Sequence, residues 1–251
     1  SPKEDLIQRG WKLQKNMLFV KKNDLDYLPF YEGKYIQQYD HRFSSFENIP
    51  RDSRFGRKPG THNPDAKQKQ NPNYEIEPRY WIDEETAFER LNYKLSITDY
   101  YFAARRVTNV ISNTRTVMAC IMPGLPANDM IISFDFEMVN SRFDYACKCL
   151  LLSSLFNSFP FDYSARLKVS ENLLKSVLYE IPLPTPKDLL YKPDELSILA
   201  IELILSAFEL AYTSTALSKL ADDLWSTSNV YLKKKIIAQK ISSNKSVGII
   251  E

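Results

Sequence analysis

The sequence predicts a mixed α+β fold, in which a mixed sheet with flanking helices is followed by a C-terminal helical segment. Residues 100–107, 116–122 and 130–136 are apolar runs of strand length, separated by turn-forming residues. Residues 140–157 then carry apolar side chains at three- and four-residue spacing, which is typical of a helix with one face on a core. Hydrophobic residues make up 44% of the 251 residues, enough for a sizeable buried core.

The N-terminal part is expected to contain two strands and a long loop. Residues 17–20 and 27–39 are apolar and aromatic runs on either side of a turn-like Asn23-Asp24 pair, and both predict strands. Residues 47–78 are poor in apolar side chains and rich in Pro, Asn, Asp, Gly, Lys and Arg, which predicts a loop. A loop of this length inside a compact domain is usually functional or disordered.

A strand over residues 79–82 is expected to lead directly into a helix over 84–95. Asp83 can cap that helix, because its carboxylate can accept hydrogen bonds from the free amides of the first turn.

The C-terminal part is predicted to be helical. Three prolines between 182 and 186 break the chain, after which Pro193 is suited to open a long helix over 194–224. A last helix is expected over 230–241. We therefore divide the chain into a domain over residues 1–190 and a helical subdomain over 191–251.

Composition limits the classes of protein that this chain can belong to. Its formal net charge is only +2, so any surface that binds nucleic acid must be local. The three cysteines, Cys120, Cys147 and Cys149, are too few for a disulfide framework, so we expect each of them to be a reduced residue of the core. No second Cys or His pair lies at zinc-ligand spacing, so we expect no bound metal.

The sequence also gives no indication of a membrane protein. The most apolar stretch, residues 196–210, is interrupted by Glu202 and Glu209 and is shorter than the roughly 20 residues that span a bilayer. The N-terminus lacks the layout of a secretion signal. We therefore expect a cytoplasmic protein without a membrane partner.

Basic residues gather in the predicted loop. Between residues 51 and 70 they exceed Asp52 and Asp65 by four charges. The loop is either a solvated surface segment or a segment that follows a phosphate backbone. The basic side chains are Arg51, Arg54, Arg57, Lys58, Lys67 and Lys69.

A second basic group lies on the predicted strands. Arg105 and Arg106 end one strand and Arg115 begins the next, so a hairpin would bring three guanidinium groups to the same edge. The planar guanidinium can bind a phosphate or a guanine edge in bidentate fashion, although any one of them could instead pair with a carboxylate of the fold.

No enzymatic motif is complete. Adenine methylation needs a glycine-containing cofactor loop and an Asn-Pro-Pro-Tyr type tetrapeptide, and residues 71–74 (NPNY) differ at the third position and do not follow an apolar strand. The alternative hypothesis is a divergent metal-dependent nuclease built on Asp24, Glu32 and Lys34, with Asp65-Ala66-Lys67 as a second acid-x-lysine triplet. His41, in an Asp-His-Arg triplet, is expected to be structural.

Several segments, taken in order, resemble the C-terminal part of the large adenine-N6 DNA methyltransferases of type IIG restriction-modification and phage-defence systems. Residues 28–43 (LPFYEGKYIQQYDHRF) resemble that family's "PLYEGKMIxQxDHRF" segment, and residues 78–81 its "PRYW" strand. Residues 104–109 and 113–117 (ARRVTN, NTRTV) are similar to its "RxITNxTNERT" hairpin, which adds Asn109 to the candidate DNA-binding residues. The last match, residues 157–168 with 181–184, is similar to the "LNSxxFDYxxRxK … LPxP" ending shared with type I specificity subunits.

The resemblance implies a target-recognition domain that reads double-stranded DNA and catalyses nothing itself. It implies an upstream methyltransferase domain in the parent protein that binds S-adenosylmethionine, with Mg²⁺ if the parent also cleaves DNA. The sequence departs from the family at Ser170-Glu171-Asn172, where relatives often have a glycine-rich turn.

Overall fold

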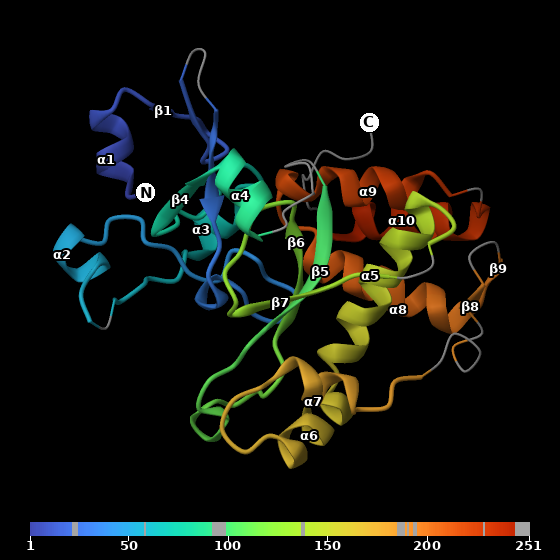
Figure 1. The fold of residues 1–251 in the computed structure, drawn as a ribbon. Coiled ribbons are helices and arrows are strands. Elements are labelled where there is room, and N and C mark those ends of the chain that lie inside the picture. The colour runs from blue at the N-terminus through green and yellow to red at the C-terminus, as the bar shows by residue number, and fades with distance from the viewer. Residues whose placement is uncertain are drawn as a thin grey trace.

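The structure is a computed structural model that describes residues 1–21, 25–57, 59–91, 99–136, 139–184, 189, 191–192, 195–227 and 229–243. It confirms the predicted mixed α+β class. A three-stranded sheet occupies the centre, with an N-terminal layer on one side and the C-terminal helices on the other (Figure 1).

All strand pairings between the named strands are antiparallel. The N-terminal sheet has the order β1 (Lys12–Leu13), β2 (Phe19–Val20), β3 (Tyr27–Phe30), β4 (Tyr80–Asp83). The central sheet has the order β6 (Ala119–Pro123), β5 (Tyr100–Arg105), β7 (Ile131–Phe134). A small ribbon joins β8 (Tyr191–Lys192) to β9 (Glu195–Leu196).

The helices lie mainly in the second half of the chain. In order they are α1 (Lys3–Gln8), α2 (Arg51–Arg54), α3 (Ala66–Gln70), α4 (Glu84–Leu91), α5 (Arg142–Phe156), α6 (Phe159–Lys168), α7 (Lys175–Tyr179), α8 (Ile198–Ala211), α9 (Ser218–Trp225) and α10 (Val230–Ser243). Single 3-10 turns cover Gly33–Tyr35, Val110–Ser112 and Thr215–Leu217.

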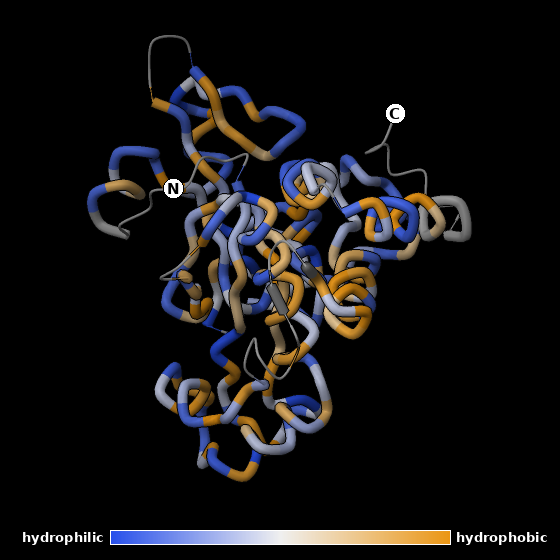
Figure 2. The backbone as a smooth tube through the Cα atoms, turned by 90° about the vertical axis from the view of Figure 1, so that its right-hand side faces the viewer, coloured by the Kyte–Doolittle hydropathy of each residue, from blue (hydrophilic) through white to orange (hydrophobic). Residues whose placement is uncertain are grey.

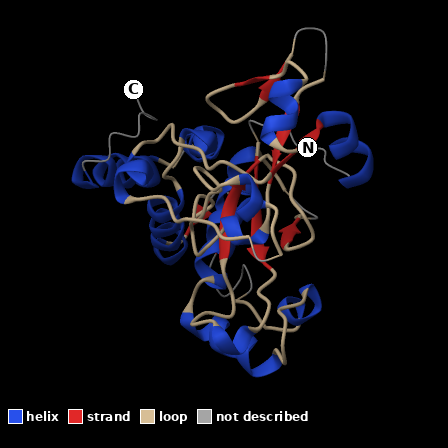
Figure 3. Cartoon of the chain, turned by 90° about the vertical axis from the view of Figure 1, so that its left-hand side faces the viewer, coloured by secondary structure: helices blue, strands red, loops and turns tan. Residues whose placement is uncertain are grey.

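The central strand β5 is buried on both faces. Phe102 and Ala104 pack in a core with α5 and the helices beyond it, whereas Tyr101 and Ala103 face a second core in the N-terminal layer. This explains why the strand is a continuous apolar run instead of an alternating pattern. Figure 3 shows the sheet between these two layers.

One apolar core includes residues from both sides of the predicted domain boundary at residue 190. It extends from Tyr100 on β5 to Ile236 on α10, and α5 contacts both α8 and α9. Figure 2 shows hydrophobic and hydrophilic stretches alternating along the helices, as expected when one face of each is buried. The helical segment is thus packed against the central sheet.

Side chains close the outer edge of β6. The Asn157 amide accepts from Ala119 N (3.0 Å) and donates to Ala119 O (2.8 Å), which imitates a neighbouring strand. Just before β6, the Asp162 carboxylate accepts from the amides of Thr116 and Val117, both at 2.8 Å. The junction of α5 and α6 is thereby attached to the hairpin.

Several predicted elements have different bounds in the structure. The predicted strand over 27–39 ends at Phe30, and the predicted loop contains the short helices α2 and α3. Asp83 does cap α4, accepting from Thr86 N at 2.8 Å, while residues 92–95 of the predicted helix lie outside the described residues.

The prediction of one helix over 194–224 is wrong. α8 ends at Ala211 and α9 begins at Ser218, and Pro193 lies outside the described residues. Between the helices Thr215 N donates to Pro72 O (2.9 Å) and Ser214 Oγ donates to Glu75 (2.6 Å). Contacts with a distant segment therefore interrupt the helix.

Replacing Asn157 with Ala should lower the free energy of unfolding by about 1–3 kcal/mol, because the buried Ala119 amide loses its acceptor. Urea unfolding measures this loss. Asn63→Ala, at an exposed asparagine, is the control and should change stability little. Equal stability of the two variants would show that the amide does not close the edge of the sheet.

Candidate nucleic-acid interface

The basic residues of the loop have unlike surroundings. Arg54 is only 4% exposed and donates to Glu77 Oε1 (2.7 Å) and to Phe46 O (2.9 Å), so its guanidinium is not accessible to a phosphate. Lys69 pairs with Asp40. Both side chains hold the loop against the N-terminal layer.

Three other cations of the loop are exposed. Arg51 pairs with Asp5 at 3.2 Å, a contact between exposed groups that competes weakly with other anions. Arg57 and Lys67 have no hydrogen-bond or ion-pair partner among the described residues. Lys58 lies outside the described residues. Arg51, Arg57 and Lys67 are thus the loop side chains that could meet a phosphate.

The predicted hairpin of β5 and β6 is present, but its three arginines are not gathered at one point. Arg115 lies 3.5 Å from Asp162, donates to Asn157 O (2.5 Å) and lies over the Phe159 ring. Arg106 lies 3.7 Å from the exposed Asp129.

Arg105 has different neighbours from Arg106 and Arg115. Its guanidinium approaches Met118 Sδ at 3.9 Å, and burial lowers its pKa. Asn109 has a left-handed backbone (φ 52°), and its amide donates to Asn172 Oδ1 at 3.3 Å. Asn109 therefore shapes the hairpin loop, and whether it also contacts DNA stays a prediction.

The surroundings of Glu32 differ from those of a metal site. Arg79 binds both oxygens of this buried carboxylate, at 2.8 and 3.1 Å, and Lys34 lies 3.4 Å away. A metal-dependent nuclease needs a second carboxylate beside Glu32, whereas the partners of Glu32 among the described residues are cations. Asp24 lies outside the described residues, within which no group of three His, Cys, Asp or Glu side chains could hold a metal ion.

Arg42 connects the loop to the helical part. This guanidinium is 1% exposed and donates to four backbone carbonyls, those of Lys69 (3.2 Å), Asn71 (3.1 Å), Tyr74 (2.7 Å) and Thr213 (2.6 Å). Thr213 follows α8, so one side chain joins segments 171 residues apart. The NPNY turn at residues 71–74 is held in this way.

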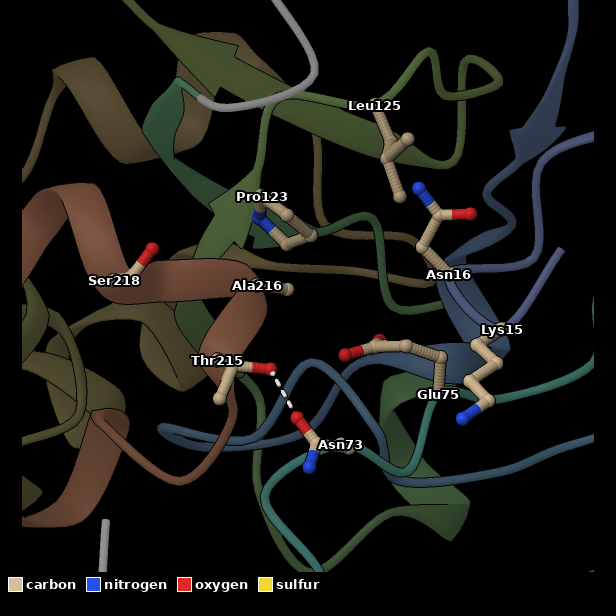
Figure 4. Close-up of a pocket in the computed structure, with 9 residues that line it drawn as sticks. All are labelled: Lys15, Asn16, Asn73, Glu75, Pro123, Leu125, Thr215, Ala216 and Ser218. Atoms are coloured by element: carbon tan, nitrogen blue, oxygen red, sulfur yellow. Dashed lines mark hydrogen bonds between the residues drawn. The ribbon is translucent and has the colours of Figure 1, made fainter. Parts of the chain in front are cut away.

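A cavity of about 360 Å³ lies beside this junction (Figure 4). The carboxylate of Glu75 points into it, and burial raises the pKa of that group while the bond from Ser214 opposes the rise. Amide and hydroxyl groups complete the polar lining, so the cavity offers hydrogen bonding. Its lining residues are Lys15, Asn16, Asn73, Glu75, Pro123, Leu125, Thr215, Ala216 and Ser218.

Comparisons with family models, curated proteins and solved structures gave no match to this chain. Within the described residues, no helix has the length and apolar character needed to cross a membrane. The resemblance to restriction-modification methyltransferases therefore rests on the sequence segments described above.

His41 should make the protein less stable in mild acid. Burial, reinforced by Arg42 and Lys69 and opposed by Asp40, lowers its pKa from 6.5 to about 3. The unfolded chain binds a proton as the pH falls below 6.5 and the folded chain does not, so stability is lost between these values. The loss should reach about 2 kcal/mol at pH 5.

Chemical unfolding of the chain and of His41→Phe across pH 5–8 measures this effect. The phenyl ring cannot titrate, and neither imidazole nitrogen has a hydrogen-bond partner among the described residues to lose. The variant should show a flatter pH profile. Parallel profiles would mean that His41 does not carry the dependence.

Proposed function

We propose that this chain is a sequence-specific DNA-recognition module of a type II adenine-specific DNA methyltransferase. It holds double-stranded DNA for an S-adenosylmethionine-dependent domain elsewhere in the parent protein, and it transfers no methyl group itself. One observation carries the proposal: the four separated segments that resemble the family contact one another directly.

Three of these contacts join matching residues: the Arg79–Glu32 pair (2.8 Å), Arg115 donating to Asn157 O (2.5 Å), and Asp162 accepting from Val117 N (2.8 Å). In a fourth, Tyr39 N donates to Ala119 O (2.8 Å), two residues after the matching segment 113–117. Mutual contacts are expected if the matching segments form the framework of one domain. The matching residues are therefore interpreted as the framework of a recognition domain.

The segments between these contacts supply the surface that would face DNA. Loops on a rigid framework are where residues that read bases can vary without disturbing the core. The loop over residues 47–78 carries the exposed Arg57 and Lys67, and the connection from Arg105 to Arg115 carries exposed polar groups. Phosphate contacts position such a module, and base contacts give it specificity.

Binding to duplex DNA should weaken steeply with salt. Replacing Arg57 and Lys67 together by Gln should lower the slope of log affinity against log salt by about two units, one for each phosphate contact. Fluorescence anisotropy over a salt series measures the slope. Lys234→Gln on α10 is the matched control and should leave it unchanged. Salt-independent binding by the intact parent would contradict the proposal.

The two loops should determine which DNA sequence is recognised. Exchanging residues 47–78 and 105–115 for the equivalent segments of a related methyltransferase should change the sequence that the full-length enzyme methylates, because each bidentate base contact discriminates by about 1–3 kcal/mol. Sequencing of methylated adenines in cells carrying the chimaera gives the new target. An unchanged target, with methylation intact, would place base reading elsewhere.

A further inference from the structure

The segment from Tyr31 to Lys34 is fixed against the start of β7. Tyr31 N donates to Pro126 O (2.9 Å) and Asn128 N donates to Tyr31 O (2.9 Å). Gly33 lies so close to Met130 that a Cβ atom would be 2.8 Å from the Met130 carbonyl oxygen. The close approach requires glycine and places Lys34 beside this strand.

Arg105, on the neighbouring strand β5, lies close to this contact between Gly33 and Met130. It pairs with Ile131 of β7, the residue after Met130. Arg105 follows Tyr101 and Ala103 in the alternation of β5, so its side chain is on the face that covers the N-terminal layer. Lys34 and Arg105 therefore approach the start of β7 from different layers, near enough for the charge of Arg105 to lower the pKa of Lys34.

Positive charge exceeds negative charge here. Arg79 occupies both oxygens of Glu32, and Lys34 shares the same carboxylate at 3.4 Å. Arg105 has no carboxylate within ion-pair distance among the described residues. Two cations thus share one carboxylate, with Arg105 as a third cation nearby, in a partly buried place where charges are screened less than at an open surface.

Burial lowers the pKa of Lys34. Among its charged neighbours Glu32 has the largest effect and raises the pKa, whereas Arg79 and Arg105 lower it. The side chains of Lys34 and Arg79 keep 28% and 22% of their surface exposed, so an anion can reach them. A guanidinium and an ammonium held in place suit a phosphate, which can accept from both.

We propose that Lys34, Arg79 and Arg105 form a binding site for one phosphate group, occupied by a backbone phosphodiester of the bound DNA. The occupant rests on the proposed function, whereas the site rests on the packing of Gly33 against Met130 and on the shared carboxylate of Glu32. The site couples the N-terminal layer and the central sheet to the same ligand.

Two measurements on the 251-residue chain test the site. The first uses inorganic phosphate as the probe, with chloride at equal ionic strength as the reference, and follows acetylation of each lysine by peptide mass spectrometry. Phosphate should slow acetylation of Lys34 at least about threefold, and the protection should disappear in Arg105→Gln. Lys12, an exposed lysine of β1, should show no protection.

The second measurement is binding of a duplex oligonucleotide, repeated with the intact parent. Lys34→Gln and Arg105→Gln should each lower the salt slope by about one unit and weaken binding about tenfold at low salt, whereas Lys12→Gln should change neither. Arg79 is left intact because it neutralises Glu32. Thermal unfolding confirms that each variant is folded.

The outcomes separate the two proposals. DNA binding with an unchanged slope in both variants overturns the site and leaves the proposed function standing. If no DNA binds but phosphate protects Lys34 in an Arg105-dependent manner, the phosphate site stands with a small anion as its ligand, and the proposed function fails. No protection and no DNA binding overturn both.

Discussion

The buried guanidinium of Arg42 is the interaction on which the arrangement of this protein most depends. It carries a charge at a position that is 1% exposed and balances it with backbone carbonyls, one from Lys69 in α3, two from the loop after α3 and one from Thr213 after α8. Burying a charge without such partners would cost more free energy than the folding of the chain provides. The loop and the end of α8 therefore have to meet around this side chain.

The same interaction organises its surroundings. Because the chain at residues 71–75 is fixed against Thr213, Ser214 reaches Glu75 and Thr215 reaches Pro72. These bonds lie where the helix ends after α8, beside the cavity into which the Glu75 carboxylate points. The Asp-His-Arg triplet is thus structural at each position, since Asp40 accepts from Arg42 N (2.7 Å) and His41 is fully buried.

Much of the fold follows from local pattern, and little of the site does. The three strands of the central sheet are apolar on both faces, and Asp83 stands where a cap is needed, so residue types alone locate them. No proline or glycine lies between α8 and α9 to indicate in the sequence that the helix is interrupted there. The cause of the interruption is the partners of Ser214 and Thr215, which are about 140 residues away in the sequence. Ser214, whose side chain caps the turn over Thr215–Leu217, is a local sign of a helix boundary, but it does not identify Glu75 and Pro72 as the partners.

Charge is harder still to interpret from the sequence, and the loop shows why. Arg51, Arg54 and Arg57 are equally basic and lie three residues apart, yet the turn of α2 buries only Arg54, against Glu77. A count of basic residues does not distinguish the buried arginine from the two exposed ones.

To locate a site for an anion, a cation that has a carboxylate of its own must be distinguished from a cation that shares one. Glu32 binds Arg79 through both oxygens and also lies 3.4 Å from Lys34, so these two cations share one carboxylate. In a chain of net charge +2, any attraction for a polyanion has to come from such local imbalance and not from the total charge.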